Sequence, residues 1–149
     1  MKIYLGADHN GFALKQELIA MLQKSGHEVI DEGDVALQTD DDFPQYAAKV
    51  VGALLADGGA DARGVLICGS GQGMCMAANR FKRIRASLVW DVAEARMSRN
   101  DDDSNVLCLP ARLLKTSEAE AVVNTWLATP FAGASRFKRR IQQLDDLPL

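Results

Sequence analysis

The sequence has no long hydrophobic run, few cysteines and no excess of basic residues. No segment approaches the roughly 18 apolar residues of a membrane-spanning helix, so no membrane association is expected. Near the N-terminus, the acidic Asp8 interrupts the segment in which a signal peptide would have its apolar core. The three cysteines are odd in number and fall in apolar segments, which argues against a disulfide framework. We therefore expect a reduced, cytoplasmic protein.

The charge balance and the length narrow the possibilities further. Lysine and arginine total 17 against 20 acidic residues, a net charge of −3, so no nucleic-acid partner is expected. The 149 residues fit one domain with a sizeable core, and no repeat or linker divides them. We expect a single domain over residues 1–149, with a basic helix at about 135–144.

Short apolar segments alternate with helical patterns along the chain. The expected strands are residues 3–7, 27–31, 63–67, 84–89 and 105–109. The expected helices lie between residues 11 and 26, 44 and 57, 72 and 80, 91 and 98, 116 and 129, and 135 and 144. Thr116 or Ser117 is expected to cap the fifth of them. The alternation predicts an α/β fold, with a five-stranded parallel sheet covered by helices on both faces.

The most informative segment joins the third strand to the helix after it. Cys68 ends the apolar strand, and the loop Gly69-Ser70-Gly71-Gln72-Gly73 follows. A thiol at the start of a helix is often reactive, and the N–H groups of a glycine-rich loop can face an anion. The glycines can also be plain turn residues, because their spacing is not that of a dinucleotide-binding loop. Cys75 and Cys108 are expected to be buried as small apolar side chains.

Two further groups of polar residues are candidates for the same site. Asp8-His9-Asn10-Gly11 follows the first strand, and parallel strands would bring this loop and the Cys68 loop to one edge of the sheet. Arg112 follows the fifth strand, and Arg136 and Arg140 lie four residues apart on one helical face suited to hold an anion. The alternative for His9 is a surface residue without a role in a site. The alternative for Arg136 and Arg140 is a solvated helix face. Together, the three groups favour a phosphorylated small molecule as the ligand.

Several motifs, taken together, resemble one enzyme family. They are Asp8-His9-Asn10-Gly11, Asp42-Phe43-Pro44, Cys68-Gly69-Ser70-Gly71-Gln72-Gly73, Ala77-Ala78-Asn79 and Ser104-Asn105-Val106-Leu107. With these motifs in order, the chain resembles the ribose-5-phosphate isomerase B and galactose-6-phosphate isomerase family from about residue 1 to residue 141. The resemblance implies a three-layer α/β/α Rossmann-like sandwich that interconverts aldose and ketose phosphates through a cis-enediolate, without metal or other cofactor. It also implies a homodimer or homotetramer whose active sites are shared between subunits.

The resemblance also implies roles for individual residues. Cys68 would be the general base, because the chain has Met74 where another branch of the family has a glutamate. Ser70 would move a proton between two substrate oxygens. The residues implied to bind the substrate are Asp8 for its hydroxyls, Asp42, the amides of Gly69, Gly71 and Gly73 for the developing anion, and His9, Arg112, Arg136 and Arg140 for its phosphate.

Asp101 and Asp102 depart from the family pattern. They stand where members that act on cyclic sugar phosphates have a His-Asn pair that opens the ring, and Phe137 replaces a further histidine. An aspartate carries the wrong charge to protonate a ring oxygen near neutral pH. Either Asp101 acts as a base at the anomeric hydroxyl, with Asp102 also contacting the substrate, or no ring has to be opened.

Our leading hypothesis is therefore an isomerase for an unusual sugar phosphate, for example an open-chain one. A tetrose 4-phosphate cannot close a furanose ring, because its fourth oxygen is esterified. One alternative is an ordinary ribose-5-phosphate isomerase. The other is a non-catalytic relative that binds sugar phosphates, against which Cys68 argues, because binding alone does not require a thiol.

Overall fold

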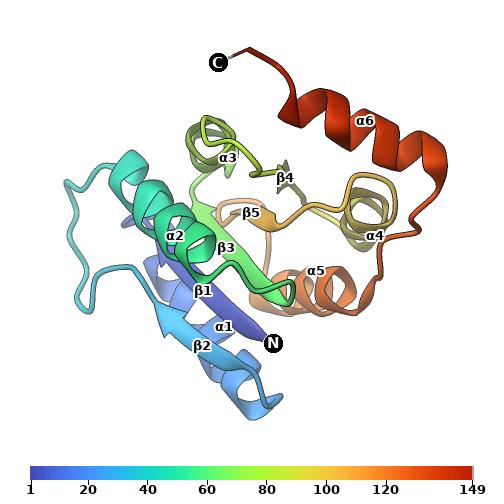
Figure 1. Ribbon diagram of the computed structural model, residues 1–149. Coiled ribbons are helices and arrows are strands. Elements are labelled where there is room, and N and C mark those ends of the chain that lie inside the picture. Colours follow the sequence, from blue (N-terminus) through green and yellow to red (C-terminus); the bar gives the residue numbers. More distant parts are fainter. Residues whose placement is uncertain (149) are drawn as a thin grey trace.

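A parallel five-stranded sheet forms the centre of the protein (Figure 1). The computed structural model describes residues 1–148. The strands are β1 (Lys2–Ala7), β2 (Glu28–Asp31), β3 (Ala62–Cys68), β4 (Ala86–Leu88) and β5 (Val106–Pro110). They lie in the order β2-β1-β3-β5-β4, and each neighbouring pair is parallel. A helix joins each strand to the next, because parallel strands need long crossover connections.

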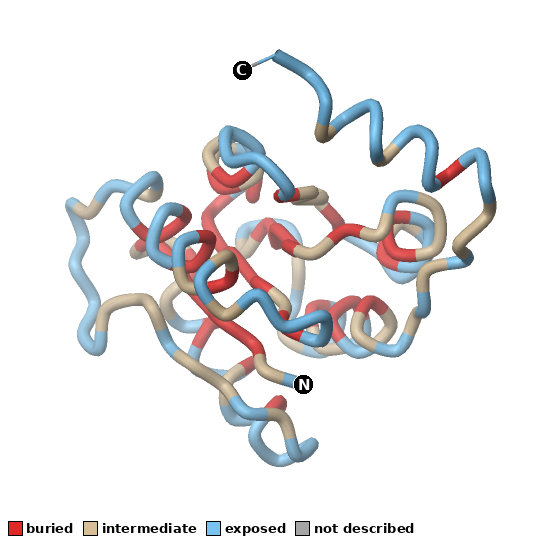
Figure 2. The backbone as a smooth tube through the Cα atoms, in the orientation of Figure 1, coloured by how far each residue is buried: buried red, intermediate tan, exposed pale blue. Residues whose placement is uncertain are grey.

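Helices cover the sheet on both faces. One face is covered by α1 (Phe12–Lys24), α4 (Val92–Asn100) and α5 (Thr116–Ala128), the other by α2 (Phe43–Asp57) and α3 (Gln72–Ala78). Successive side chains of a strand point to opposite faces, so Val65 and Ile67 enter one core while Leu66 and Cys68 enter the other. Figure 2 shows the buried residues gathered in the strands and in the helix faces next to them. The predicted α/β/α sandwich is thus confirmed.

Two boundaries follow directly from glycine and proline. α1 ends at Lys24, and Gly26 beyond it adopts a φ of +83°, a conformation that favours glycine. Pro44 lies in the first turn of α2, where its missing N–H leaves no hydrogen bond unmade. Both agree with the positions expected from the sequence.

Two other boundaries differ from the expected ones. The fourth strand covers only Ala86–Leu88 instead of residues 84–89, because it lies at the sheet edge and pairs with β5 alone. The fifth helix is preceded by Lys115, so Thr116 and Ser117 are its first two residues and not its caps. The N–H of Lys115 donates to the Glu118 carboxylate at 2.8 Å, which provides half of a capping box.

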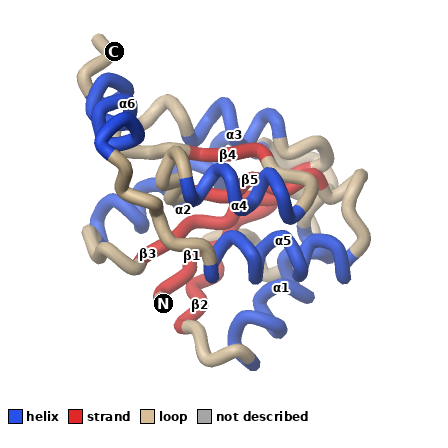
Figure 3. Tube along the Cα trace, turned by 90° about the vertical axis from the view of Figure 1, so that its right-hand side faces the viewer, coloured by secondary structure: helices blue, strands red, loops and turns tan. Residues whose placement is uncertain are grey.

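The last helix, α6 (Ser135–Asp145), lies outside these layers, on the α4 side of the molecule (Figure 1 and Figure 3). Phe137 is its single buried residue, so the helix exposes a largely polar and basic surface. The N–H of Ala132 donates to the carbonyl of Asn100, which ties the segment before α6 to the end of α4. No helix within residues 1–148 is long and apolar enough to cross a membrane.

Candidate active site

The carboxyl edge of the sheet gathers the loops that follow β1, β3 and β5. From β1 the chain moves outward to β2 on one side, and from β3 it continues to the other side. Open α/β sheets bind ligands at such a switch point. The N–H of Asp8 donates to the carbonyl of Ile67 (3.2 Å), and that of Ala111 to the carbonyl of Cys68 (2.9 Å). These two hydrogen bonds join the three loops at one place.

Cys68 is the last residue of β3, and only 5% of it is exposed. Its sulfur accepts a hydrogen bond from the backbone N–H of Gly71 at 3.1 Å, a contact that holds the thiol against the loop. Gly71 adopts a φ of +73°, which turns the loop back over the thiol. Ser70 is exposed in the same loop. A thiol, a hydroxyl and backbone donors therefore lie at one point of the sheet edge.

Asp8 and His9 lie beside this loop, in the turn after β1. The carboxylate of buried Asp8 accepts the N–H groups of Asn10 (2.9 Å) and Gly11 (3.2 Å), which fixes the turn. Nδ1 of His9 is 2.7 Å from the carboxylate of Asp41, and its Nε2 is 3.0 Å from the amide nitrogen of Asn10. The His9 ring is therefore held from both sides.

Arg112 links the two loops. Its backbone N–H donates to the carbonyl of Gly69 (3.0 Å). A methyl group at Gly69 would lie 3.0 Å from Nε of Arg112, so the guanidinium packs directly on this glycine. Its Nη2 donates to Oδ1 of Asn10 at 3.1 Å. Arg112 also lines an open cavity of about 420 Å³, together with Ser70, Trp90 and other residues. Arg112, which the sequence predicts to bind a phosphate, thus lies between the two loops and beside a space large enough for a small molecule.

The start of α2 also reaches this edge. Asp42 is its N-cap residue, but the Asp42 side chain is exposed and does not cap the helix. The neighbouring Asp41 is the residue that binds His9, and its side chain is only 6% exposed. The ring of Phe43 packs against Gly73, where an added Cβ would lie 2.7 Å from Cζ. The structure thus brings Asp41 into this cluster, while a substrate contact for Asp42 stays a prediction.

The four remaining predicted site residues lie at the opposite edge of the sheet. α4 runs back from the carboxyl end of β4, so Asp101 and Asp102 at its end lie near the amino end of β5. The five residues of β5 span about 17 Å, which separates this turn from Cys68. Arg136 and Arg140 are exposed on α6, and Arg140 is close enough to Asp102 to affect the pKa of its carboxyl. Within one chain, these residues do not meet the thiol.

The environment of Asp102 makes its carboxyl less acidic than usual. Burial and the negative charge of Asp101 raise the pKa of Asp102, and the positive charges of Arg140 and Arg85 partly oppose them. Asp101 accepts a hydrogen bond from the side-chain amide of Asn100 at 2.6 Å. The charge of Asp101 thus acts on the Asp102 carboxyl at the end of α4.

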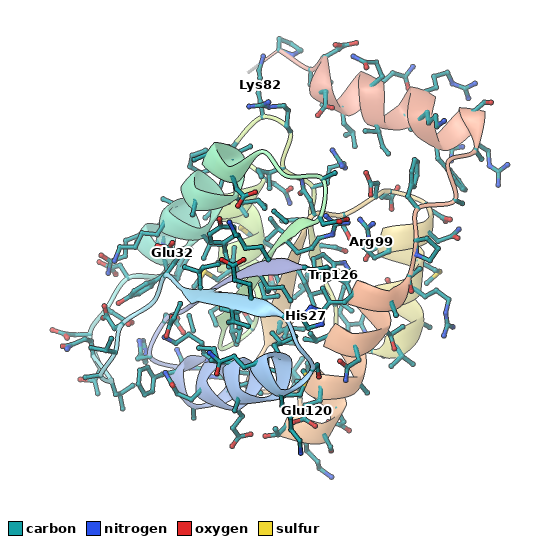
Figure 4. All side chains as sticks on the ribbon, turned by 60° about the horizontal axis from the view of Figure 1, so that its bottom comes forward. His27, Glu32, Lys82, Arg99, Glu120 and Trp126 are labelled. Atoms are coloured by element: carbon teal, nitrogen blue, oxygen red, sulfur yellow. The ribbon has the colours of Figure 1, made fainter. Side chains whose placement is uncertain are left out.

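Arg99 braces the turn that contains this pair. Its buried guanidinium donates to the Asp103 carboxylate (2.7 Å) and to the carbonyl of Ser104 (2.6 Å). It also lies over the ring of Trp126, 6.0 Å from the centroid, and Figure 4 labels both residues on the neighbouring helices α4 and α5. Nε1 of Trp126 donates to the hydroxyl of Ser104 at 2.8 Å. The turn is therefore fixed in place although it reaches the surface.

Comparison with known proteins identifies the family. The family model described as Ribose/Galactose Isomerase matches residues 3–144. The chain belongs to this family. Ribose-5-phosphate isomerase B of Mycolicibacterium paratuberculosis is 38% identical over 144 residues, which cover 97% of this chain and 89% of that protein.

Solved structures of ribose/galactose isomerase family members superpose closely on this chain. The ribose 5-phosphate isomerase of Thermotoga maritima is 40% identical, with a TM-score of 0.92 and 98% of both chains covered. Ribose-5-phosphate isomerase B of Mycoplasma genitalium, crystallised with bound ribulose-5-phosphate, is 35% identical, with a TM-score of 0.92 and 97% of this chain and 93% of that chain covered. The predicted family, its fold and an enzyme that interconverts aldoses and ketoses are thereby confirmed.

Two polar residues of this site, Asn10 and Asp41, were not predicted from the sequence. Asn10 belongs to the motif that follows the first strand, but its contact with Arg112 joins positions 102 residues apart. Asp41 lies between two other aspartates, Asp40 and Asp42, and no pattern separates them. Within residues 1–148, no group of three or more His, Cys, Asp or Glu side chains is arranged to hold a metal ion.

Proposed function

We propose that this protein interconverts ribose 5-phosphate and ribulose 5-phosphate. The observation that supports this most directly is the similarity, over nearly the whole length, to relatives named ribose-5-phosphate isomerase B. The cluster of Cys68, Ser70 and Arg112 at the sheet edge suits the chemistry of such a substrate. The comparisons therefore favour this ordinary substrate over the unusual one that Asp101 led us to expect.

In the proposed reaction, Cys68 acts as a thiolate base. It takes the proton from the carbon next to the carbonyl group, and negative charge develops on the substrate oxygens. The Gly71 N–H is bound to the Cys68 sulfur, so we assign the stabilisation of that charge to the other N–H groups of the loop 69–73, at the start of α3. Ser70 transfers a proton between the two oxygens, and Cys68 returns its proton to the neighbouring carbon. Atoms and electrons balance within the substrate.

The test is turnover of ribose 5-phosphate by the wild type and by Cys68→Ala. Loss of the base is expected to lower kcat by about 100-fold or more. Cys75→Ala is the matched control, because Cys75 lies on α3 outside the proposed machinery, and its kcat should stay within about twofold of the wild type. Unchanged turnover in Cys68→Ala would remove Cys68 as the base.

We also infer that a second copy of the chain completes each active site. Arg136 and Arg140 cannot reach Cys68 of their own chain, because the length of the sheet lies between them. Next to the Cys68 loop, Trp90 is 50% exposed and Leu113 is 73% exposed, an apolar surface suited to a partner. A second copy seated on this surface would bring its own arginines to the phosphate.

An open-chain sugar phosphate is a second candidate substrate. Asp101 and Asp102 favour it, because they occupy the positions where the family resemblance expects a ring-opening His-Asn pair. The two substrates are compared by kcat/KM for ribose 5-phosphate and for a tetrose 4-phosphate. Efficient turnover of ribose 5-phosphate that is unchanged in Asp101→Asn contradicts the open-chain hypothesis. A preference of more than about tenfold for the tetrose phosphate contradicts the ordinary one.

Proton exchange at the carbon next to the carbonyl, followed by NMR in deuterated water, reports enediol formation even where net conversion is small. Binding of either sugar phosphate without exchange or turnover would instead support the non-catalytic alternative.

A further inference from the structure

Four side chains from three separate parts of the chain form one line of hydrogen bonds at the carboxyl edge. Nη2 of Arg112 is 3.1 Å from Oδ1 of Asn10. Nδ2 of Asn10 is 3.0 Å from Nε2 of His9, and Nδ1 of His9 is 2.7 Å from Oδ1 of Asp41. The line begins at a cation and ends at a carboxylate.

The chemistry of the groups fixes the direction of every hydrogen bond in this line. A guanidinium can only donate, so Asn10 must face Arg112 with its carbonyl oxygen. The amide NH₂ of Asn10 then faces His9, and Nε2 of His9 must accept. The ring proton of neutral His9 is therefore on Nδ1, where the Asp41 carboxylate accepts it.

Asp41 itself is held firmly. Its carboxylate also accepts the backbone N–H of His9 at 3.0 Å, so ring and backbone of His9 are bound to the same oxygen. Burial acts to raise the pKa of Asp41, but the hydrogen bonds from the ring and the backbone of His9 act against it, and the pKa is lowered. Asp41 thus stays an anion, and hence a pure acceptor, in the folded protein.

The loop that presents Asp41 is anchored at its other end. The buried ammonium of Lys15 binds both carboxylate oxygens of Asp31 (2.7 and 2.6 Å) and the carbonyl of Asp34 (2.9 Å). The hydroxyl of buried Tyr46 donates to the Asp34 carboxylate at 2.6 Å. These contacts leave Asp41 little freedom to move away from His9.

We propose that Asp41 is a positioning residue that selects the Nδ1–H tautomer of His9 and thereby orders Asn10 and Arg112 as one unit for the substrate's phosphate. Without Asp41, His9 can adopt the Nε2–H tautomer. Its Nε2–H would then face the NH₂ of Asn10, so that two hydrogen-bond donors would meet. Asn10 would then have to turn its NH₂ toward the Arg112 guanidinium, where two donors meet. The role of the phosphate rests on the proposed function, but the tautomer does not.

Histidine side-chain NMR on ¹⁵N-labelled protein tests the tautomer directly. The sequence has only two histidines, and a His27→Gln variant assigns the signals to His9. The wild type is expected to hold His9 with the proton on Nδ1. Asp41→Ala should shift the population toward the Nε2–H form, and Asp41→Asn should retain the Nδ1–H form because its amide oxygen still accepts. An unchanged tautomer in Asp41→Ala would overturn the proposal.

Affinity for inorganic phosphate and steady-state kinetics test the consequence. Asp41→Ala is expected to weaken binding of inorganic phosphate and to raise KM for ribose 5-phosphate by about tenfold each, with kcat lowered less than about threefold. Asp41→Asn should recover most of the affinity. Asp40→Ala is the matched control, because Asp40 is an exposed neighbour. Phosphate affinity that stays unchanged in Asp41→Ala would contradict the ordering of Arg112.

Asn10→Ala provides an independent variant should Asp41→Ala fail to fold. It interrupts the line beyond His9, so it should weaken phosphate binding while His9 keeps its proton on Nδ1. Phosphate affinity unchanged in Asn10→Ala would equally overturn the proposal. A wild type that binds phosphate with the predicted tautomer but does not isomerise ribose 5-phosphate would refute the proposed function and leave this inference standing.

Discussion

At the scale of single residues, Gly71 is the position where backbone geometry matters most for the site. Its φ of +73° is costly for any other residue, and an added Cβ would lie 2.5 Å from Cδ1 of Leu88 and 3.1 Å from the carbonyl carbon of Leu109. Gly71→Ala is therefore expected to lower the free energy of unfolding by about 2 kcal/mol. It should also lower kcat, because the loop shift moves the N–H away from Cys68. Denaturant unfolding and turnover measure the two effects.

Gly52 provides the control for that variant. It lies in the middle of α2, is exposed, and has no atom within 4 Å of the position of an added Cβ. Gly52→Ala is expected to raise the free energy of unfolding by about 0.5–1 kcal/mol, because alanine is the better helix former. A Gly71→Ala variant as stable as the wild type, or more stable, would show that the strain argued for Gly71 is wrong.

Cys75 is the second residue with a distinctive expected behaviour. The neighbouring thiol of Cys108 lowers the pKa of Cys75 to about 7, although burial acts in the opposite direction. The thiolate is the reactive form, and its fraction rises from about a tenth at pH 6 to about nine-tenths at pH 8. Alkylation of Cys75 by iodoacetamide should therefore become about tenfold faster across this range, as measured by peptide mass spectrometry.

Cys108 serves as the internal reference for this labelling. It is fully buried, and burial raises its pKa well above the usual value, so it should stay unlabelled in the native protein. A labelling midpoint for Cys75 above about pH 8.5, the value of a free cysteine, would contradict the lowered pKa of Cys75. Alkylation experiments on Cys68 consequently belong in the Cys75→Ala background.

How far the sequence predicts the site differs from residue to residue. Cys68 and its glycines could be located because the strand, the thiol and the loop are contiguous. Asp41 could not be chosen over Asp40 and Asp42, because only the path of the loop decides which carboxylate meets His9. Local pattern thus identifies contiguous features, and contacts between distant segments require the folded chain.

At the scale of elements, the contact between α1 and β2 is made by an ion pair as well as by apolar side chains. Lys15 is completely buried, and its partner Asp31 lies at the end of β2 with 29% of its side chain exposed. Asp31→Ala leaves the ammonium with one carbonyl partner and is expected to cost about 3 kcal/mol of stability. Lys15→Met should cost less, about 1 kcal/mol, because Asp31 can then be hydrated.

The double variant Lys15→Met/Asp31→Ala checks the mechanism of that loss. Because the unpaired buried charge is absent, it should be more stable than Asp31→Ala alone, as measured by urea unfolding. A double variant whose loss equals the sum of the two single losses would mean that the ion pair has no coupling energy. The same experiment tests how well the loop after β2, which presents Asp41, is anchored.

Hydrophobic periodicity predicts the elements but not their neighbours. The helices and strands appear close to the expected residues because apolar positions repeat with the period of each structure. The order β2-β1-β3-β5-β4 is not encoded in that period, since every inner strand is apolar on both faces. The edge position of β4 also explains why its strand is shorter than its apolar segment.

At the scale of the whole molecule, the predicted site residues divide between the two edges of the sheet. Asp8, Cys68 and Arg112 lie at the carboxyl edge, whereas Asp102 and Arg140 lie at the amino edge. The sequence pattern could not reveal this separation, because it depends on the direction in which α4 crosses back along the sheet. In a two-fold symmetric dimer, the amino edge of each copy can face the carboxyl edge of the other, which would reunite both groups in the shared site that we propose.

Subunit complementation tests this arrangement. Cys68→Ala lacks the base, and Arg136→Gln/Arg140→Gln lacks the phosphate ligands of α6, so each variant alone should be nearly inactive. In a hybrid dimer with shared sites, one site combines an intact Cys68 with intact arginines, and the other site has both defects. Random pairing makes half of the dimers hybrids, so an equal mixture refolded together should recover about a quarter of the wild-type activity. Hybrids demonstrated by mass but without recovered activity would mean that Arg136 and Arg140 do not complete the partner's site.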